Sequence, residues 1–114
     1  YAVVVQATRG REDSEGEWQP WMNERKDGYD TIDWISRQSW SDGNVGMLGG
    51  SYLGEAQLLA AAEGHPALKC IVPYVSGSEH FFGVPYDHGV PNLEILDWLR
   101  ATTNKSKTVE AKPS

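Results

Sequence analysis

The sequence has little cysteine, no long apolar run and a shortage of positive charge. Cys70 is the one cysteine, so no disulfide can form within the chain, and its apolar neighbours Ile71 and Val72 predict that it is a buried core residue. An absence of disulfides is compatible with a reducing cytoplasm, where we expect the protein to act. No apolar stretch approaches the roughly 18 residues of a membrane span, and no signal-peptide pattern is visible.

The charge balance disfavours two classes of partner. The 16 acidic residues outnumber the 10 basic ones and give a net charge of −6. Nucleic acids and anionic membranes both bind proteins through clustered Lys and Arg side chains, so neither is expected as a partner. The three histidines show no metal-ligand spacing, and a lone cysteine offers no Cys pair, so we expect no metal and no cofactor.

Apolar runs and helical patterns alternate along the chain. The expected order of strand, helix, strand, helix, strand is typical of an α/β domain with a parallel sheet. The expected strands are residues 1–5, 45–48 and 69–75, and the expected helices are residues 24–38, 52–63 and 92–102. The chain does not open with Met and begins inside the first apolar run, which suggests that upstream sequence is missing.

Side chains in and before the first helix have expected roles. Asn23 is the predicted N-cap, and Trp18 and Trp21 are expected to pack the long loop of residues 7–23. The buried stripe of the helix is expected to contain Tyr29, Ile32 and Ile35. Residues 76–92 are rich in Gly, Pro and aromatics and are expected to be irregular.

A serine stands between the second predicted strand and the second predicted helix. A nucleophile elbow needs this placement, with small neighbours where strand and helix approach each other. Gly49 and Gly54 supply them, Ser51 is the candidate nucleophile, and the N–H of Tyr52 is the candidate oxyanion donor. The same turn is also compatible with an N-cap serine or, more weakly, with phosphate binding, although it lacks the Lys of a P-loop.

Several separated motifs agree with one family. The segment 49–54 reads Gly-Gly-Ser-Tyr-Leu-Gly, and the other matching segments are residues 3–10, 14–16, 30–35 and 40–47. Together they resemble the X-Pro dipeptidyl-peptidase and cocaine-esterase group of α/β hydrolases. In that group the nucleophile elbow has the sequence pattern Gly-x-Ser-Tyr-x-Gly. The resemblance covers about residues 1–90.

The resemblance implies a serine hydrolase that attacks an ester or amide carbonyl through Ser51, with the Tyr52 N–H as one oxyanion donor. The family's second donor lies upstream of the matched segment, and its Asp and His lie downstream, so the chain is expected to be incomplete on its own. The implied division is a partial α/β-hydrolase core at residues 1–78, the start of a helical cap at 79–103 and a polar tail at 104–114.

The sequence departs from the family at two positions. Ala7 stands where the family usually has Asp, and Glu12 stands where a small residue, often Gly, is usual. Ala7 is expected to remove a polar contact that orders the loop around Arg9, a residue expected to form a structural salt bridge. Loop stability, rather than chemistry, is therefore expected to change.

The three histidines of the chain are weak candidates for the catalytic base. His65 is expected to be a surface turn residue after the second helix, whereas His80 and His88 follow the third strand and leave the same sheet edge as Ser51. His88 adjoins Asp87, but sequence neighbours rarely give a catalytic acid–base pair, and aromatic cap packing is the preferred interpretation of this stretch.

Two classes of function stay open. The preferred one is an acyl hydrolase segment that acts on a small ester or peptide substrate. The alternative is a non-catalytic truncated α/β module. Because three parallel strands would leave unpaired edges, we expect a homo-oligomer, a complementing chain or marginal stability.

Overall fold

The computed structural model describes residues 1–77 and 86–103 of the chain. Contacts divide these residues into two units. The first takes in Tyr1–Gln6 and the described part of Gln19–Ser78, and the second takes in Ala7–Trp18 and the described part of Glu79–Ser114. Each unit is described by itself below. The expected division at residues 78 and 103 stays a prediction.

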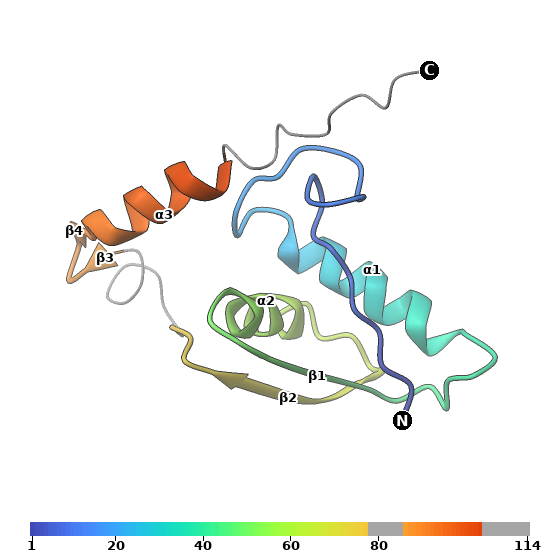
Figure 1. Cartoon of the computed structure of the whole chain (residues 1–114). Helices are drawn as coiled ribbons and strands as arrows, with labels where there is room; N and C mark the ends of the chain where they lie inside the picture. Colours follow the sequence, from blue (N-terminus) through green and yellow to red (C-terminus); the bar gives the residue numbers. More distant parts are fainter. Residues whose placement is uncertain (78–85, 104–114) are drawn as a thin grey trace, which may run out of the picture. The chain divides into compact units, whose positions relative to one another are not determined.

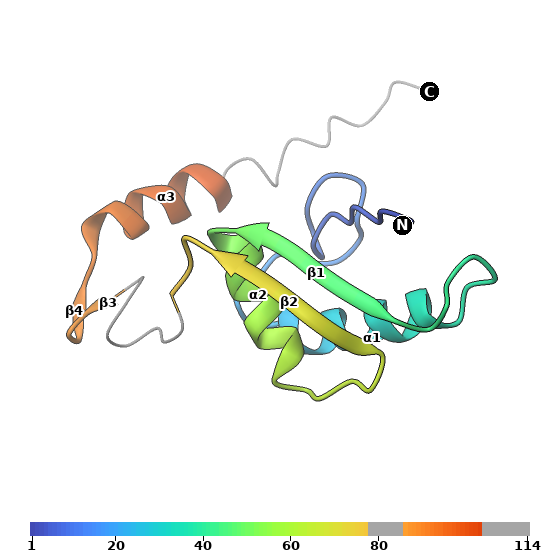
Figure 2. The same cartoon turned by 90° about the horizontal axis from the view of Figure 1, so that it is seen from below.

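The first unit contains a parallel pair of strands with two helices on one face. β1 (Val45–Gly50) and β2 (Leu68–Tyr74) run parallel and are joined through α2 (Tyr52–Ala61). α1 (Glu24–Ser36) precedes them in the chain. Figures 1 and 2 show both helices on the same side of the β1–β2 pair. The expected α/β architecture is thus present in part, with two strands in this sheet rather than three.

The expected first strand is absent. Tyr1–Val5 forms no strand, and the side chain of Val5 is 92% exposed. The segment is tied to α1 instead, since the Thr31 hydroxyl donates a hydrogen bond to Gln6 Oε1 at 2.8 Å. A run of β-branched residues predicts a buried strand, but a strand forms only where a second strand accepts and donates its backbone hydrogen bonds. Neither strand of the described sheet pairs with this segment.

The first helix forms where the apolar spacing predicts it, two residues shorter at its C-terminal end. Ile32 is 2% exposed and Ile35 packs against the same core, while Tyr29 remains partly exposed. The predicted N-cap is wrong in its chemistry, because the Asn23 side chain makes no capping hydrogen bond. The Asn23 N–H instead donates to Glu24 Oε2 at 3.2 Å.

The core of the first unit lies between the helices and the sheet. Ile32, Val45, Ala60 and Ala67 are its buried members. The two helices approach closely at Gly28, where an added Cβ would lie 2.6 Å from the Cβ of Ala60. A small residue is therefore required at this crossing.

The opposite face of the sheet carries exposed apolar side chains. Leu48 is 73% exposed, and Val72 and Tyr74 are also exposed. Cys70 lies on β2 in the same alternating series and is exposed, so its predicted burial is wrong. The apolar sequence around Cys70 predicts a strand, but it does not predict which of the two faces of that strand is covered.

The second unit contains a short hairpin and one helix. β3 (Tyr86–Asp87) pairs antiparallel with β4 (Val90–Pro91), within a stretch expected to be irregular. α3 (Leu93–Thr103) follows, and Asn92 Oδ1 accepts a hydrogen bond from the Glu94 N–H at 3.0 Å, as an N-cap does. Trp18 packs edge-on against Trp98 in this unit, with ring centroids 6.0 Å apart, so Trp18 does anchor its loop as expected.

None of the helices among the described residues is long and apolar enough to cross a membrane.

Candidate functional site

Ser51 occupies the turn between β1 and α2, as the sequence predicts. It is exposed, and its backbone has φ 55° and ψ −128°. A non-glycine residue rarely adopts positive φ, and such strain persists only where the surroundings impose it. Strained, exposed serines at strand-to-helix turns are typical of nucleophile elbows.

Backbone hydrogen bonds fix this turn on both sides. The Ser51 N–H donates to the carbonyl oxygen of Tyr74, at the end of β2, at 3.0 Å. The Ser51 carbonyl accepts from the N–H groups of Gly54 and Glu55 at 2.9 and 3.1 Å, which closes the first turn of α2. The strained residue is thus held by the neighbouring strand and by the helix that it begins.

The close approach expected at Gly49 and Gly54 is present. A Cβ added to Gly49 would lie 2.6 Å from the Cβ of Leu53, and one added to Gly54 would lie 2.6 Å from the Ser76 hydroxyl oxygen. Any side chain at Gly49 would push the first turn of α2 away from β1. The glycines therefore determine how near Ser51 lies to the end of the sheet.

Gln57 is a buried polar residue that sequence reasoning missed. Its amide nitrogen donates to the carbonyls of Gly49 at 3.0 Å and Leu53 at 2.9 Å, and its Oε1 accepts from the Val72 N–H at 3.0 Å. One side chain thereby joins β1, α2 and β2 just below the turn. The signal was available in principle, because Gln57 is a polar residue four positions after Leu53 in a mostly apolar helix.

The Tyr52 side chain lies in a second polar group that the sequence did not reveal. Its hydroxyl donates to Glu24 Oε1 and accepts from the Trp21 N–H at 3.1 Å. The indole N–H of Trp21 donates to Glu55 Oε2. Glu24 and Glu55 are both buried. Glutamate residues are usually expected on the surface, so the burial of Glu24 and Glu55 is visible only in the folded structure.

His65 is buried, which corrects the expectation of a surface turn residue. Its Nδ1 accepts a hydrogen bond from the Ala67 N–H at 3.1 Å, and its ring packs edge-on against Tyr29 at 4.5 Å between centroids. Its Nε2 lies 3.5 Å from Asp33 Oδ1. The turn itself was predicted correctly, but the partners on α1 lie about thirty residues away in sequence and bury the ring.

Asp33 on α1 is the acid in this group. A hydrogen bond from Arg37, one turn later, lowers the pKa of Asp33, and the contact with His65 acts in the same direction. His65 and Asp33 therefore form a structural contact between α1 and the turn after α2.

His88 and Asp87 form a contact in the second unit. His88 Nδ1 lies 2.6 Å from Asp87 Oδ1, and both side chains are largely exposed. His80, Phe81 and Phe82 lie outside the described residues. The expectation that neither histidine is the base stays a prediction.

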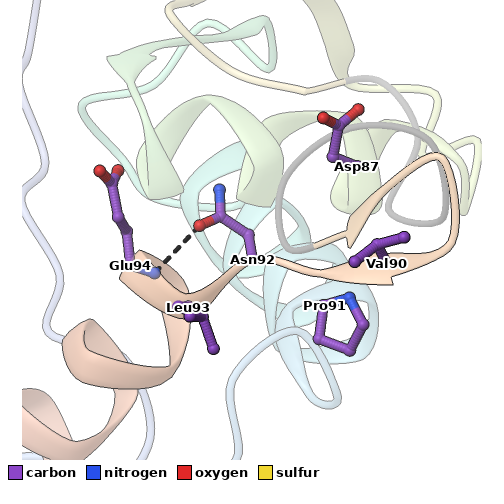
Figure 3. Close-up of a pocket in the computed structure, with 6 residues that line it drawn as sticks. All are labelled: Asp87, Val90, Pro91, Asn92, Leu93 and Glu94. Atoms are coloured by element: carbon purple, nitrogen blue, oxygen red, sulfur yellow. Dashed lines mark hydrogen bonds between the residues drawn. The ribbon is translucent and has the colours of Figure 1, made fainter.

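The second unit has an open pocket of about 520 Å³. Figure 3 shows the residues that line it. Its lining comes from the β3–β4 hairpin and the start of α3, and includes Asp87 and Glu94. Neither Ser51 nor Tyr52 contributes to it. Within residues 1–77 and 86–103, no three His, Cys, Asp or Glu side chains are grouped so that they could hold a metal ion.

Known proteins of similar sequence are hydrolases. A cocaine esterase of a Rhodococcus species is 46% identical over 89 residues, which are 78% of this chain. A putative serine esterase of Mycobacterium bovis is 35% identical over 105 residues, or 88% of this chain. The chain spans 16% of the length of each of these relatives.

Two solved structures of similar fold are also named as a hydrolase and an aminopeptidase. A CocE/NonD family hydrolase of Staphylococcus aureus superposes with a TM-score of 0.73 at 30% identity, covering 90% of this chain and 19% of that protein. An aminopeptidase from a marine sediment Thaumarchaeota archaeon gives a TM-score of 0.67 at 28% identity, covering 94% of this chain and 20% of that protein.

The family match extends over the whole sequence. The sequence model of the X-Pro dipeptidyl-peptidase (S15) family matches residues 1–114. Together with the relatives above, this match establishes that the chain belongs to the X-Pro dipeptidyl-peptidase (S15) family.

Proposed function

We propose that this chain carries the nucleophile of a serine hydrolase that cleaves an ester or amide bond. Ser51 is the nucleophile and the Tyr52 N–H is one oxyanion donor. The catalytic acid and histidine come from chain outside these residues, so the segment is not active alone. The proposal covers both bond types because the relatives include proteins named as esterases and one named as an aminopeptidase.

The proposed reaction follows the general course of serine hydrolases. A histidine base takes the proton of the Ser51 hydroxyl as its oxygen bonds to the substrate carbonyl carbon. The carbonyl oxygen becomes negatively charged and accepts hydrogen bonds from donors that include the Tyr52 N–H. The leaving alcohol or amine takes the proton from the base, and water then releases the acyl group from Ser51.

The geometry of Ser51 carries the proposal. The residue is exposed, has a positive φ, and stands between a parallel strand and the first turn of a helix. An N-cap serine would explain the position without chemistry, but the Ser51 side chain makes no capping hydrogen bond. The strain at Ser51 is thus unexplained by helix capping and is typical of a nucleophile held for reaction.

The test is covalent labelling with a fluorophosphonate, applied to the protein as the cell makes it. We expect one adduct on Ser51, located by peptide mass spectrometry, and loss of esterase activity in Ser51→Ala. Ser39→Ala, which removes an exposed serine from the turn after α1, is the matched control and keeps both. An active enzyme whose adduct lies on another residue would refute the assignment.

The alternative is a non-catalytic α/β module that associates through its sheet. The exposed apolar side chains of Leu48, Val72 and Tyr74 on the uncovered face favour it. Light scattering and the fluorophosphonate probe, both applied to the protein as the cell makes it, separate the two. A stable oligomer in which Ser51 does not react supports the module, whereas labelling of Ser51 supports the hydrolase.

A further inference from the structure

Two buried carboxylates lie beside the turn that holds Ser51. Glu24 is 8% exposed and Glu55 is 5% exposed. Burial of a carboxylate without hydrogen-bond partners is costly, so a fold keeps such groups only where they are well satisfied. Both residues stand in the first turn of a helix, where the helix dipole stabilises negative charge.

The two carboxylates are linked through hydrogen bonds to Tyr52 and Trp21. Glu24 accepts from the Tyr52 hydroxyl, which in turn accepts from the backbone N–H of Trp21 at 3.1 Å. The indole N–H of Trp21 donates to Glu55. The rings of Trp21 and Tyr52 also pack together, with centroids 5.7 Å apart. This carboxylate-linked group, comprising Glu24, Trp21, Tyr52 and Glu55, joins the segment before α1 to the first turn of α2.

The group is tied to a strained part of the backbone. Trp21 has φ 63° and Ser51 has φ 55°, so both of the connected segments contain a non-glycine residue in an unfavourable conformation. Strain of this kind persists where several contacts over-determine it. The backbone bond from Ser51 to Tyr74 restrains the turn from the sheet side, and the carboxylate-linked group restrains it from the opposite, helical side through the Tyr52 side chain.

We propose that Glu24 and Glu55 are positioning residues for the Ser51–Tyr52 peptide. Glu24 holds the Tyr52 hydroxyl, Glu55 holds Trp21, and together they fix the direction of the Tyr52 N–H toward the developing oxyanion. This inference rests on the proposed function of Ser51 and Tyr52. Neither carboxylate touches the substrate, and each acts through the aromatic side chain that it binds.

The expected effect is on the chemical step. A small displacement of a reacting group or an oxyanion donor reduces turnover by as much as about 100-fold without removing the group. Loss of the restraint should therefore reduce kcat by about 10- to 100-fold and leave KM within about twofold. A residue that supports only the folded state would change the melting temperature without this separation of kcat from KM.

The variants are measured with a p-nitrophenyl ester on the protein as the cell makes it. Glu24→Ala and Tyr52→Phe each remove the same hydrogen bond, so each should lower kcat by about 10- to 100-fold and the double variant should be no worse than the poorer single one. Glu24→Gln keeps an acceptor oxygen for the Tyr52 hydroxyl and should restore kcat to within about threefold of the wild type. Trp21→Phe, which removes the donor to Glu55, should lower kcat about tenfold.

Glu63→Ala is the matched control, because Glu63 forms an exposed ion pair with Arg25, the residue after Glu24. It should leave kcat unchanged. Wild-type kcat in folded Glu24→Ala and Trp21→Phe would overturn the positioning role while Ser51 labelling still supports the nucleophile. Additive losses in the double variant would also overturn it. If Tyr52→Phe fails to fold, the positioning role is tested by two other results. These are the difference in kcat between Glu24→Ala and Glu24→Gln, and the kcat of Trp21→Phe.

Discussion

The side-chain amide of Gln57 donates a hydrogen bond to the carbonyl of Gly49 at 3.0 Å, and so joins α2 to the end of β1. The same side chain also satisfies the Leu53 carbonyl and the Val72 N–H. Gln57 is 1% exposed, so water cannot replace it. A single residue therefore satisfies three backbone groups around the strand-to-helix turn.

Replacement of Gln57 should destabilise the protein strongly. Gln57→Met keeps the length of the side chain but leaves buried backbone groups without partners, and we expect a loss of about 2–4 kcal/mol in the free energy of unfolding. Urea denaturation followed by circular dichroism measures it. Gln19→Met, at an exposed glutamine, should change stability by less than about 0.5 kcal/mol. Equal stability of the two variants would show that water or a neighbour satisfies these groups.

The helix crossing at Gly28 gives a second prediction. Gly28→Ala places a Cβ 2.6 Å from the Cβ of Ala60, and this overpacking should outweigh the better helix propensity of Ala and destabilise the protein by about 1–2 kcal/mol. Gly46→Ala is the control, since its new Cβ meets nothing nearer than 3.7 Å. The control should be neutral or slightly stabilising in thermal denaturation. A stabilised Gly28→Ala would mean that α1 can move away from α2 at little cost.

The turn at Ser51 was predictable because its determinants are local. Gly49, Ser51 and Gly54 lie within six residues, and a strand, a sharp turn and a helix need those residues in that order. The amphipathic spacing of α1 was an equally local signal.

The predictions are wrong where contacts between residues distant in sequence determine strand pairing or burial. The pattern of Tyr1–Val5 suits a buried strand, but no strand of the described sheet pairs with it. Cys70 lies on the uncovered face of its strand, and His65 is buried by residues of α1. The contact of Glu24 with Tyr52 joins residues that are 28 positions apart, so no short window of sequence contains both partners.

A third prediction concerns the loop where the sequence departs from its family. Glu12 has φ 50°, a conformation that costs a non-glycine residue roughly 1–2 kcal/mol. Glu12→Gly should stabilise the loop by about 0.5–1 kcal/mol, after the entropy that Gly loses on folding. Slower hydrogen exchange at the Ser14 N–H, which bonds to the Arg11 carbonyl at 2.9 Å, would report it.

The neighbouring residue provides the control for this change. Asp13 has no positive φ, so Asp13→Gly should only add flexibility to the unfolded chain and speed exchange at the same amide. If both glycine variants speed exchange, the strain at Glu12 is relieved by its neighbours and the family's preference for a small residue there has another origin.

The last prediction is a pH dependence that originates at Asp33. The pKa of Asp33 is lowered in the folded state, chiefly by the hydrogen bond from Arg37 and also by His65. A lowered pKa means that the ionised carboxylate stabilises the fold above its ordinary value of 3.8, and that this contribution is lost as the pH falls from 3.8 through the lower folded value. Asp33→Asn should therefore be less stable than the wild type at pH 6, and the difference should shrink as the pH is lowered below 3.8. Urea denaturation across that range measures the difference, with Asp30→Asn, an exposed aspartate of the same helix, as the control. A difference between wild type and Asp33→Asn that stays constant down to the lowest pH would mean that packing of the Asn side chain, rather than the charge on Asp33, accounts for the effect.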